Sequence, residues 1–149
     1  MLEKEVGTAE TPTGTFQLLD FSEVSDPGEY YLVCGALISR TFPIGDDVWE
    51  DSVWKVLNFY LCERCGCYVP GKHSACCRDR FSEHEGKTIL ANGGWHDAGD
   101  VSQQAAQTGE VVQAMFENAR RMKDKDRLLY LRLMEEAQWG LDFVLRTRF

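Results

Sequence analysis

Two carboxylates three positions apart, Asp97 and Asp100, stand in a segment suited to close contact with a ligand. This segment, residues 93–100, reads Gly-Gly-Trp-His-Asp-Ala-Gly-Asp. The Ala-Gly between the acids permits a tight turn, so both side chains can point into one small volume and hold a water molecule. A carboxylate that accepts a proton from a held water is a general base, and Trp95 offers a flat apolar face on which a sugar ring can stack.

The same spacing has two simpler interpretations. Asp97 can form an Asx turn while Asp100 caps a helix that is expected to begin near Ser102. The two carboxylates can also bind calcium, a hard cation that prefers oxygen ligands. Spacing alone leaves all three interpretations open.

A second group of potential ligands is the cysteine cluster, because five of the six cysteines lie between Cys62 and Cys77, alongside His73. Zinc takes four thiolate or imidazole ligands in a tetrahedron. A disulfide framework would spread its cysteines along the chain, so the clustering favours metal ligation or a reducing compartment. Cys34 falls in a strand-like run and is expected to be a small core residue, and Cys62 has the same alternative.

Short strand-like runs precede these groups in the chain. Residues 1–14 are polar and rich in turn formers, and they are expected to form a loop or a frayed end. Strands are expected within 15–19, 29–34 and 38–44. Three strands are few for an independent sheet, so they are interpreted as the last strands of a β-sandwich whose earlier strands are absent.

Helical periodicity follows the strands. It predicts helices over about residues 47–63, 102–122 and 126–147, the last two forming an antiparallel hairpin. Residues 62–95 between the first two helices show little periodicity, and a loop of that length is expected to be functional or held by a metal.

The last predicted helix has an apolar and a polar face. The solvent face is assigned to a set of charged residues that includes Glu136. The core stripe is assigned to Leu128, Leu131, Met134, Ala137, Leu141, Val144 and Leu145. This helix ends without a capping residue, and its apolar face needs a partner to pack against. The chain is therefore expected to be part of a longer protein.

Charge and hydropathy limit the classes of partner. The net charge of −8 makes the chain a poor partner for nucleic-acid phosphates and for anionic membranes, whereas a neutral ligand or a small cation suits it. Apolar residues make up 44% of the chain, which is enough for a buried core. The start of the chain is too polar for a signal peptide, and no apolar run is long enough for a membrane-spanning helix.

Several motifs, taken in order, resemble glycoside hydrolase family 9, the inverting cellulases and related β-glucanases. Residues 93–100 match the family signature of Gly-Gly-Trp, then His or Tyr, then Asp-Ala-Gly-Asp. Residues 57–66 resemble the first helix of the catalytic domain and the Arg-Cys-Gly that follows it. Residues 73–77 resemble a His-x-x-Cys-His segment, residues 136–143 resemble a later helix, and residues 15–44 resemble the end of an immunoglobulin-like module.

The resemblance implies a mainly α fold made of the first helices of an (α/α)₆ barrel, preceded by a few strands of a truncated immunoglobulin-like sandwich. The boundary is expected between residues 1–45 and residues 46–149. The resemblance implies that Asp100 is the general base and that Asp97 helps to hold the water. It also implies a general-acid Glu, which no residue of this chain matches, so the chain alone is expected to be inactive.

The resemblance further implies a structural zinc, because family members with His before the first Asp tend to carry one. The ligands implied for this chain are Cys65, Cys76, Cys77 and His96. Cys77 is a departure, since the family usually has His there. Cys67 and His73 are the reserve ligands, and a zinc-free cluster of reduced cysteines is the alternative.

The expected partner is a β-glucan, together with the remainder of the barrel or a second copy of the chain. A small zinc-binding interaction module without catalysis is the alternative function. Which glucan is cleaved, and in which compartment, stays open.

Overall fold

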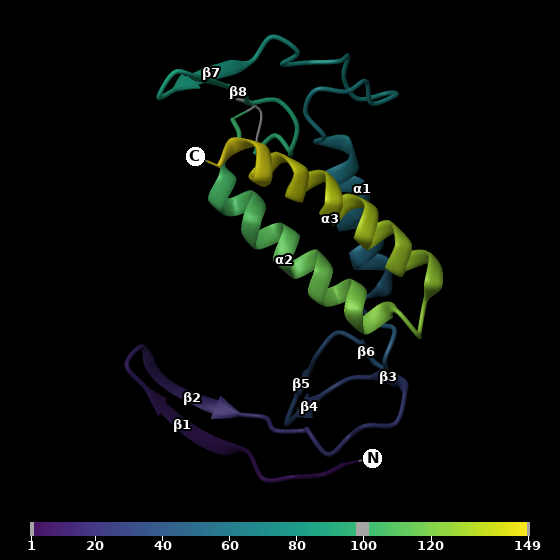
Figure 1. Ribbon diagram of the computed structural model, residues 1–149. Helices are drawn as coiled ribbons and strands as arrows, with labels where there is room; N and C mark the ends of the chain where they lie inside the picture. The colour runs from purple at the N-terminus through teal and green to yellow at the C-terminus, as the bar shows by residue number, and fades with distance from the viewer. Residues whose placement is uncertain (1, 98–101, 149) are drawn as a thin grey trace. The chain divides into compact units, whose positions relative to one another are not determined.

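The computed structural model describes residues 2–97 and 102–148 (Figure 1). The chain divides into two compact units, one up to Glu50 and one from Asp51 onward. The division lies close to the domain boundary expected after residue 45.

Over residues 2–50 the first unit has six short strands, which pair in three separate antiparallel ladders of two strands each. The pairs are β1 (Gly7–Thr11) with β2 (Gly14–Leu18), β3 (Gly28–Tyr30) with β6 (Phe42–Ile44), and β4 (Val33–Cys34) with β5 (Leu37–Ile38).

Two expectations for this unit are wrong. Residues 1–14 contain β1 and do not form a plain loop. Cys34 is exposed and not a core residue, because β4 and β5 pair only with each other and leave both faces open. Among residues 2–50 none is buried, so the described ladders do not by themselves show a sandwich of packed sheets.

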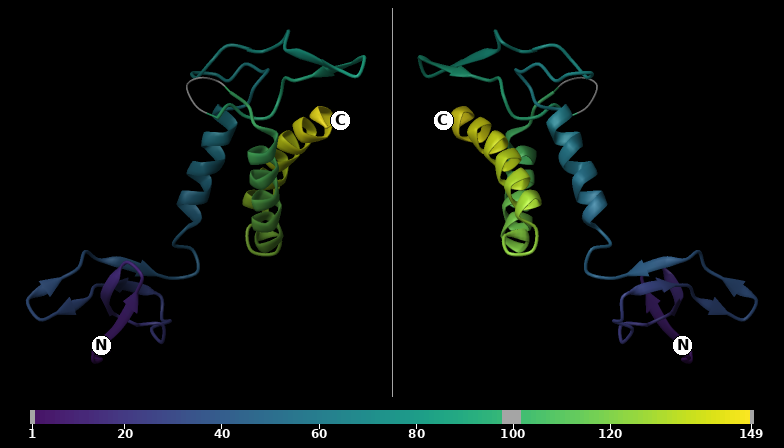
Figure 2. Two further views of the ribbon diagram at one scale, coloured as in Figure 1. Left: turned by 90° about the vertical axis from the view of Figure 1, so that its left-hand side faces the viewer. Right: turned by 90° about the vertical axis from the view of Figure 1, so that its right-hand side faces the viewer.

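The described residues of the second unit, 51–97 and 102–148, contain three helices and one hairpin, with the helices in the order that the periodicity predicts. They are α1 (Glu50–Cys62), β7 (Phe81–His84), β8 (Lys87–Leu90), α2 (Ala105–Met122) and α3 (Arg127–Thr147). The antiparallel pairing of α2 with α3 is confirmed (Figures 1 and 2). Asp126 caps α3, since its side chain accepts a hydrogen bond of 2.9 Å from the backbone N–H of Leu129. None of the described helices is long and apolar enough to cross a membrane.

The hairpin of β7 and β8 was not predicted, because its four-residue strands lie in a stretch without clear alternation. Its turn is made by Glu85 and Gly86, whose φ angles of 49° and 74° are both left-handed. Such a turn suits the twist of a two-residue hairpin, although Glu is a rare first residue in it. All of β7 is exposed, while β8 lies against α3.

The core lies between α1, the α2–α3 hairpin and the loop before α2. Its buried apolar residues are Leu57, Trp95, Val112, Met115, Ala119, Leu129, Leu133 and Ala137. The stripe predicted for α3 is wrong at Leu128, Leu131 and Leu145, which are exposed by 61%, 46% and 45%. It is confirmed at Ala137, which is buried, and at Met134 and Leu141, which pack against the core. This helix is apolar around much of its circumference, so periodicity allows more than one stripe, and packing against α2 and Trp95 selects the one through Leu129 and Leu133.

Candidate metal centre and catalytic loop

The loop that carries the candidate catalytic segment is joined to the end of α1 by a short antiparallel bridge between Arg64 and Trp95. The backbone N–H of Cys65 donates to the carbonyl oxygen of Gly94 over 3.0 Å, and that of His96 donates to the carbonyl oxygen of Glu63 over 2.9 Å. This bridge places Cys65 and His96 side by side, although they are far apart in the sequence.

Four side chains meet at this bridge, and we call them the metal group: Cys65, Cys76, Cys77 and His96. Their ligand atoms all lie within 4.8 Å of one another, which is a grouping that could hold a metal ion. The Sγ of Cys76 lies 3.9 Å from the Sγ of Cys65 and 3.5 Å from the Nε2 of His96. These are the four residues that the sequence singled out, and the structure brings them together.

The surroundings of Cys65 and His96 favour the neutral form of each of these two side chains. Burial, followed by a hydrogen bond with Cys77, raises the pKa of the Cys65 thiol to about 12. Burial, followed by the charge of His73, lowers the pKa of His96. The imidazole is therefore neutral at pH 7, as metal ligation requires, whereas the thiol needs a nearby cation to ionise.

The two reserve ligands lie outside the metal group. The thiol of Cys67 donates to the carbonyl oxygen of Arg64 over 3.7 Å. The Nδ1 of His73 is 2.7 Å from the carbonyl oxygen of Ser74, and its ring centroid is 5.5 Å from that of His96. Both residues therefore border the metal group without entering it.

The candidate catalytic carboxylates follow His96 directly. Asp97 is exposed, and its backbone N–H donates to the carbonyl oxygen of Ser102 over 2.9 Å, so residues 97 and 102 are held together. Asp100 lies outside the described residues. Next to this point the amide of Gln103 donates to the carbonyl oxygen of Gly93 and accepts a hydrogen bond of 3.0 Å from Arg80.

Trp95 has a different environment from the one expected of a sugar-stacking residue. Only 5% of it is exposed, and its ring packs in the core, with its centroid 5.0 Å from that of Tyr60. It also lies so close to Gly140 that a Cβ there would collide with the ring. Because neither ring face is open, the structure supports a packing role for Trp95 and corrects the predicted role as a stacking surface.

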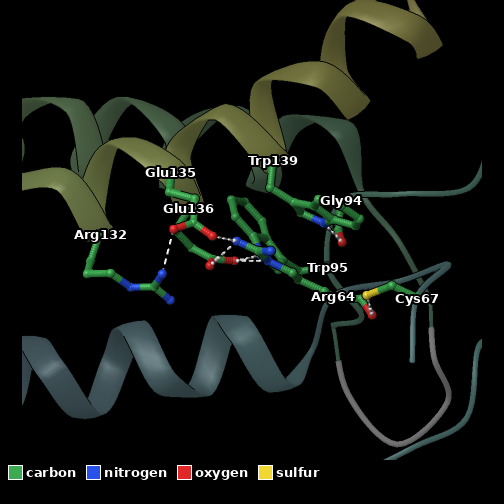
Figure 3. Close-up of polar contacts among 8 residues, drawn as sticks. All are labelled: Arg64, Cys67, Gly94, Trp95, Arg132, Glu135, Glu136 and Trp139. Atoms are coloured by element: carbon green, nitrogen blue, oxygen red, sulfur yellow. Dashed lines mark hydrogen bonds and ion pairs between the residues drawn. The ribbon is translucent and has the colours of Figure 1, made fainter. Parts of the chain in front are cut away.

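A buried polar cluster behind the loop escaped the sequence prediction. Glu136, expected on the solvent face, has a side chain only 2% exposed, and it accepts a hydrogen bond of 2.7 Å from the indole N–H of Trp95 (Figure 3). It also forms a two-point ion pair with Arg64, over 3.1 Å and 2.7 Å. Its burial could have been found from the stripe Leu129, Leu133, Glu136, Gly140 and Phe143, which has helical spacing and contains one acid and one mid-helix glycine.

Comparison with known proteins identifies a matching family and a curated relative of this chain. The family model of glycosyl hydrolase family 9 matches residues 49–149. Endoglucanase D of Acetivibrio thermocellus is 28% identical over 158 residues, which cover 91% of this chain and 25% of that protein.

Two solved structures have a similar fold. A Zn-binding triple mutant of the family 9 endoglucanase J30 matches with a TM-score of 0.64 and 28% identity, over 91% of this chain and 31% of that one. The family 9 endoglucanase J30 itself matches with a TM-score of 0.67 and 24% identity, over 98% of this chain and 32% of that one. The chain thus spans about a quarter of the curated relative and under a third of these structures. Because the family model covers most of its length, the chain belongs to glycosyl hydrolase family 9.

Proposed function

We propose that this chain is the N-terminal part of the catalytic domain of an inverting β-glucan hydrolase that cleaves β-1,4-linked glucose polymers or oligosaccharides. Support comes from the family match over residues 49–149 and from relatives that are named endoglucanases. The observation that carries the proposal is the bridge between Arg64 and Trp95, which holds the Gly-Gly-Trp-His-Asp segment against α1.

In this proposal Asp100 accepts the proton of the attacking water and Asp97 helps to hold that water. The water attacks the anomeric carbon while a carboxylic acid on the opposite side protonates the leaving oxygen. In inverting enzymes the two carboxyl groups stand roughly 6.5–9.5 Å apart, which leaves room for the water. The acid is a Glu outside this chain, so the chain contributes half of the catalytic pair.

The metal group is proposed to bind a structural zinc ion. With Zn–S bonds of about 2.3 Å and a Zn–N bond of about 2.0 Å, a tetrahedron places two sulfurs about 3.8 Å apart, and a sulfur and a nitrogen about 3.5 Å apart. The distances of 3.9 Å and 3.5 Å from Cys76 to Cys65 and to His96 fit this geometry. With four protein ligands, zinc would have no open position for catalysis, and it would fix the loop before Asp97 to α1.

The rest of the fold is assigned by the same resemblance. Residues 46–149 are proposed to form the first helices of an (α/α)₆ barrel, and residues 1–45 the end of an immunoglobulin-like module. The remaining barrel helices, or a second copy of the chain, would cover the exposed apolar side chains Val56, Phe59, Leu128 and Leu131.

The catalytic part of the proposal is tested with a chimera in which this chain replaces the matching third of endoglucanase J30. We expect hydrolysis of a soluble β-1,4-glucan, followed by the release of reducing ends, and a drop in kcat of about 10²–10⁴ for Asp100→Asn. The unfused chain should release none. An Asp100→Asn chimera with unchanged kcat would exclude Asp100 as the base, and hydrolysis by the unfused chain would show that no outside acid is needed.

A zinc-binding interaction module without catalysis is the second candidate, and the convergence of the metal group favours it. It predicts a chimera that binds zinc in stoichiometric amount, has the circular dichroism of a folded barrel, and hydrolyses no glucan. Both candidates predict bound zinc, so the release of reducing ends from glucan by the folded, zinc-loaded chimera separates the two functions.

A further inference from the structure

We propose that Glu136 is a positioning residue for the metal group. Its buried carboxylate sets the spacing between the two chain segments that carry Cys65 and His96, and so the placement of the loop that leads to Asp97. The inference rests on the proposed function, because metal binding at this group is proposed there.

The first observation is that the carboxylate of Glu136 joins three pieces of the chain. It stands on α3, and it accepts hydrogen bonds from Arg64, at the end of α1, and from Trp95, in the candidate catalytic loop. Oε1 takes two of these bonds, from the Nε of Arg64 and the Nε1 of Trp95, and Oε2 takes the bond from the Nη2 of Arg64. All three donors come from the two residues of the bridge between α1 and the loop.

The second observation is where these two donor residues lie in the sequence. Arg64 directly precedes Cys65, and Trp95 directly precedes His96. One carboxylate therefore holds the residue before one ligand and the residue before another. A shift of Glu136 would move both backbone segments, and with them the sulfur and the imidazole that must share one tetrahedron.

Trp139 also connects α3 to the same two chain segments. The indole N–H of Trp139, one turn along α3, donates to the carbonyl oxygen of Gly94 over 2.7 Å (Figure 3). The guanidinium of Arg64 lies over the ring of Trp139, 4.9 Å from the centroid. Both chain segments are thus held to α3 at two points each, which leaves the spacing between Cys65 and His96 little freedom.

Stability alone does not account for a charged residue at this place. An apolar pair of similar volume often replaces a buried ion pair without loss of stability. A carboxylate differs from an apolar side chain in fixing the direction of three donors, which is a geometric effect. Groups that orient the ligands of a metal typically change its affinity by about 10–100-fold.

The test compares Glu136→Gln with Glu135→Gln in the 149-residue chain. Both variants remove one negative charge that Arg64 contacts, but Glu135 is half exposed and lies 3.4 Å from Arg64. The probe is Co²⁺, whose visible absorption reports tetrahedral thiolate ligation. We expect Glu136→Gln to bind Co²⁺ about 10–100-fold more weakly, with a changed absorption spectrum. Glu135→Gln should bind within about twofold of the parent chain, since its contact with Arg64 is long and open to solvent.

A second variant separates positioning from folding. Arg64→Met with Glu136→Leu replaces the ion pair by apolar side chains, and its folding is checked by helical circular dichroism and cooperative melting. We expect it to fold and still to bind Co²⁺ about 10–100-fold more weakly than the parent. Parent-like affinity and spectrum in this variant, or in Glu136→Gln, would overturn the positioning role. A parent chain that binds neither Co²⁺ nor Zn²⁺ would instead overturn the proposed metal centre, and this inference with it.

Discussion

The packing of the candidate catalytic loop on α3 predicts that Gly140→Ala destabilises the protein, even though alanine is the better helix former. A Cβ at Gly140 would lie 2.7 Å from the Cγ2 of Val112 and closer still to the Cη2 and Cζ3 of Trp95. Both neighbours are buried, and neither side chain can move aside without shifting the residues of the core around it. Gly140 is thus the position at which the indole ring of Trp95 packs against the backbone of α3.

The expected magnitude is a balance of two opposing effects. Alanine in place of a mid-helix glycine is worth about 1 kcal/mol of stability. Inserting a methyl group into a packed core costs about 1–3 kcal/mol, and contacts below 3 Å with two rigid neighbours place Gly140 near the upper value. The net loss is therefore about 1–2 kcal/mol. Gly109 in α2 is the matched control, since a Cβ there meets no heavy atom within 4 Å, and Gly109→Ala should gain about 0.5–1 kcal/mol.

Urea unfolding followed by helical circular dichroism measures both variants at one fixed zinc concentration, because bound metal adds to apparent stability. The midpoint should fall for Gly140→Ala and rise for Gly109→Ala. Equal midpoints, or a rise for both, would refute the close approach of Trp95 to α3. Trp95 fluorescence cannot report this alone, because the chain has four tryptophans.

Three further predictions follow from the site and the fold. Zinc should protect the three cysteines of the metal group from alkylation, and a chelator should expose them before the α2–α3 hairpin unfolds, while Cys34 reacts under both conditions. Gly94→Ala should be more destabilising than Gly71→Ala, by about 1–3 kcal/mol, because both glycines have left-handed φ angles but a Cβ at Gly94 would lie 2.8 Å from the ring of Phe143. Asp126→Ala should cost about 1 kcal/mol by removing the N-cap of α3, whereas Asp126→Asn should cost far less.

Each of these predictions has an outcome that contradicts it. Alkylation of all six cysteines at saturating zinc, read by mass spectrometry, would exclude the metal group as a zinc site. Equal urea midpoints for the Gly94 and Gly71 variants would show that Phe143 does not pack on the loop. For the cap, an alanine variant as stable as the asparagine variant in thermal melts would exclude the side-chain hydrogen bond of Asp126.

The helices and the four residues of the metal group could be predicted from the sequence because each leaves a local signal. The three helices show helical spacing, and the metal group combines residue types that are rare together with a resemblance to a family motif. The role of Trp95 was misassigned because an aromatic residue beside two glycines looks the same in sequence whether its ring faces a ligand or a helix. Only the contact with Gly140, formed between distant segments, decides between these arrangements.

The burial of Glu136 was missed because an acid in a helix is usually solvated, although its place in the stripe through Leu129 and Leu133 gave a local signal. Its hydrogen-bond partners could not be predicted, because Arg64, about half the chain away, and Trp95 are distant in the sequence. The core stripe predicted for α3 was wrong at Leu128, Leu131 and Leu145, because several apolar stripes coexist on one helix and tertiary packing selects among them. The β7–β8 hairpin was missed because its turn uses Glu-Gly in place of the common Asn-Gly or Asp-Gly.

The position of the β7–β8 hairpin within the chain makes it a natural place for variation in length. It lies between Cys77 and His96, two members of the metal group, so its ends are anchored whatever the size of the loop between them. Doubling the length of an anchored flexible loop costs only about 0.6 kcal/mol. Extra residues between Glu85 and Gly86 would extend the exposed tip of the hairpin, so new surface could be added there while the helices keep their packing.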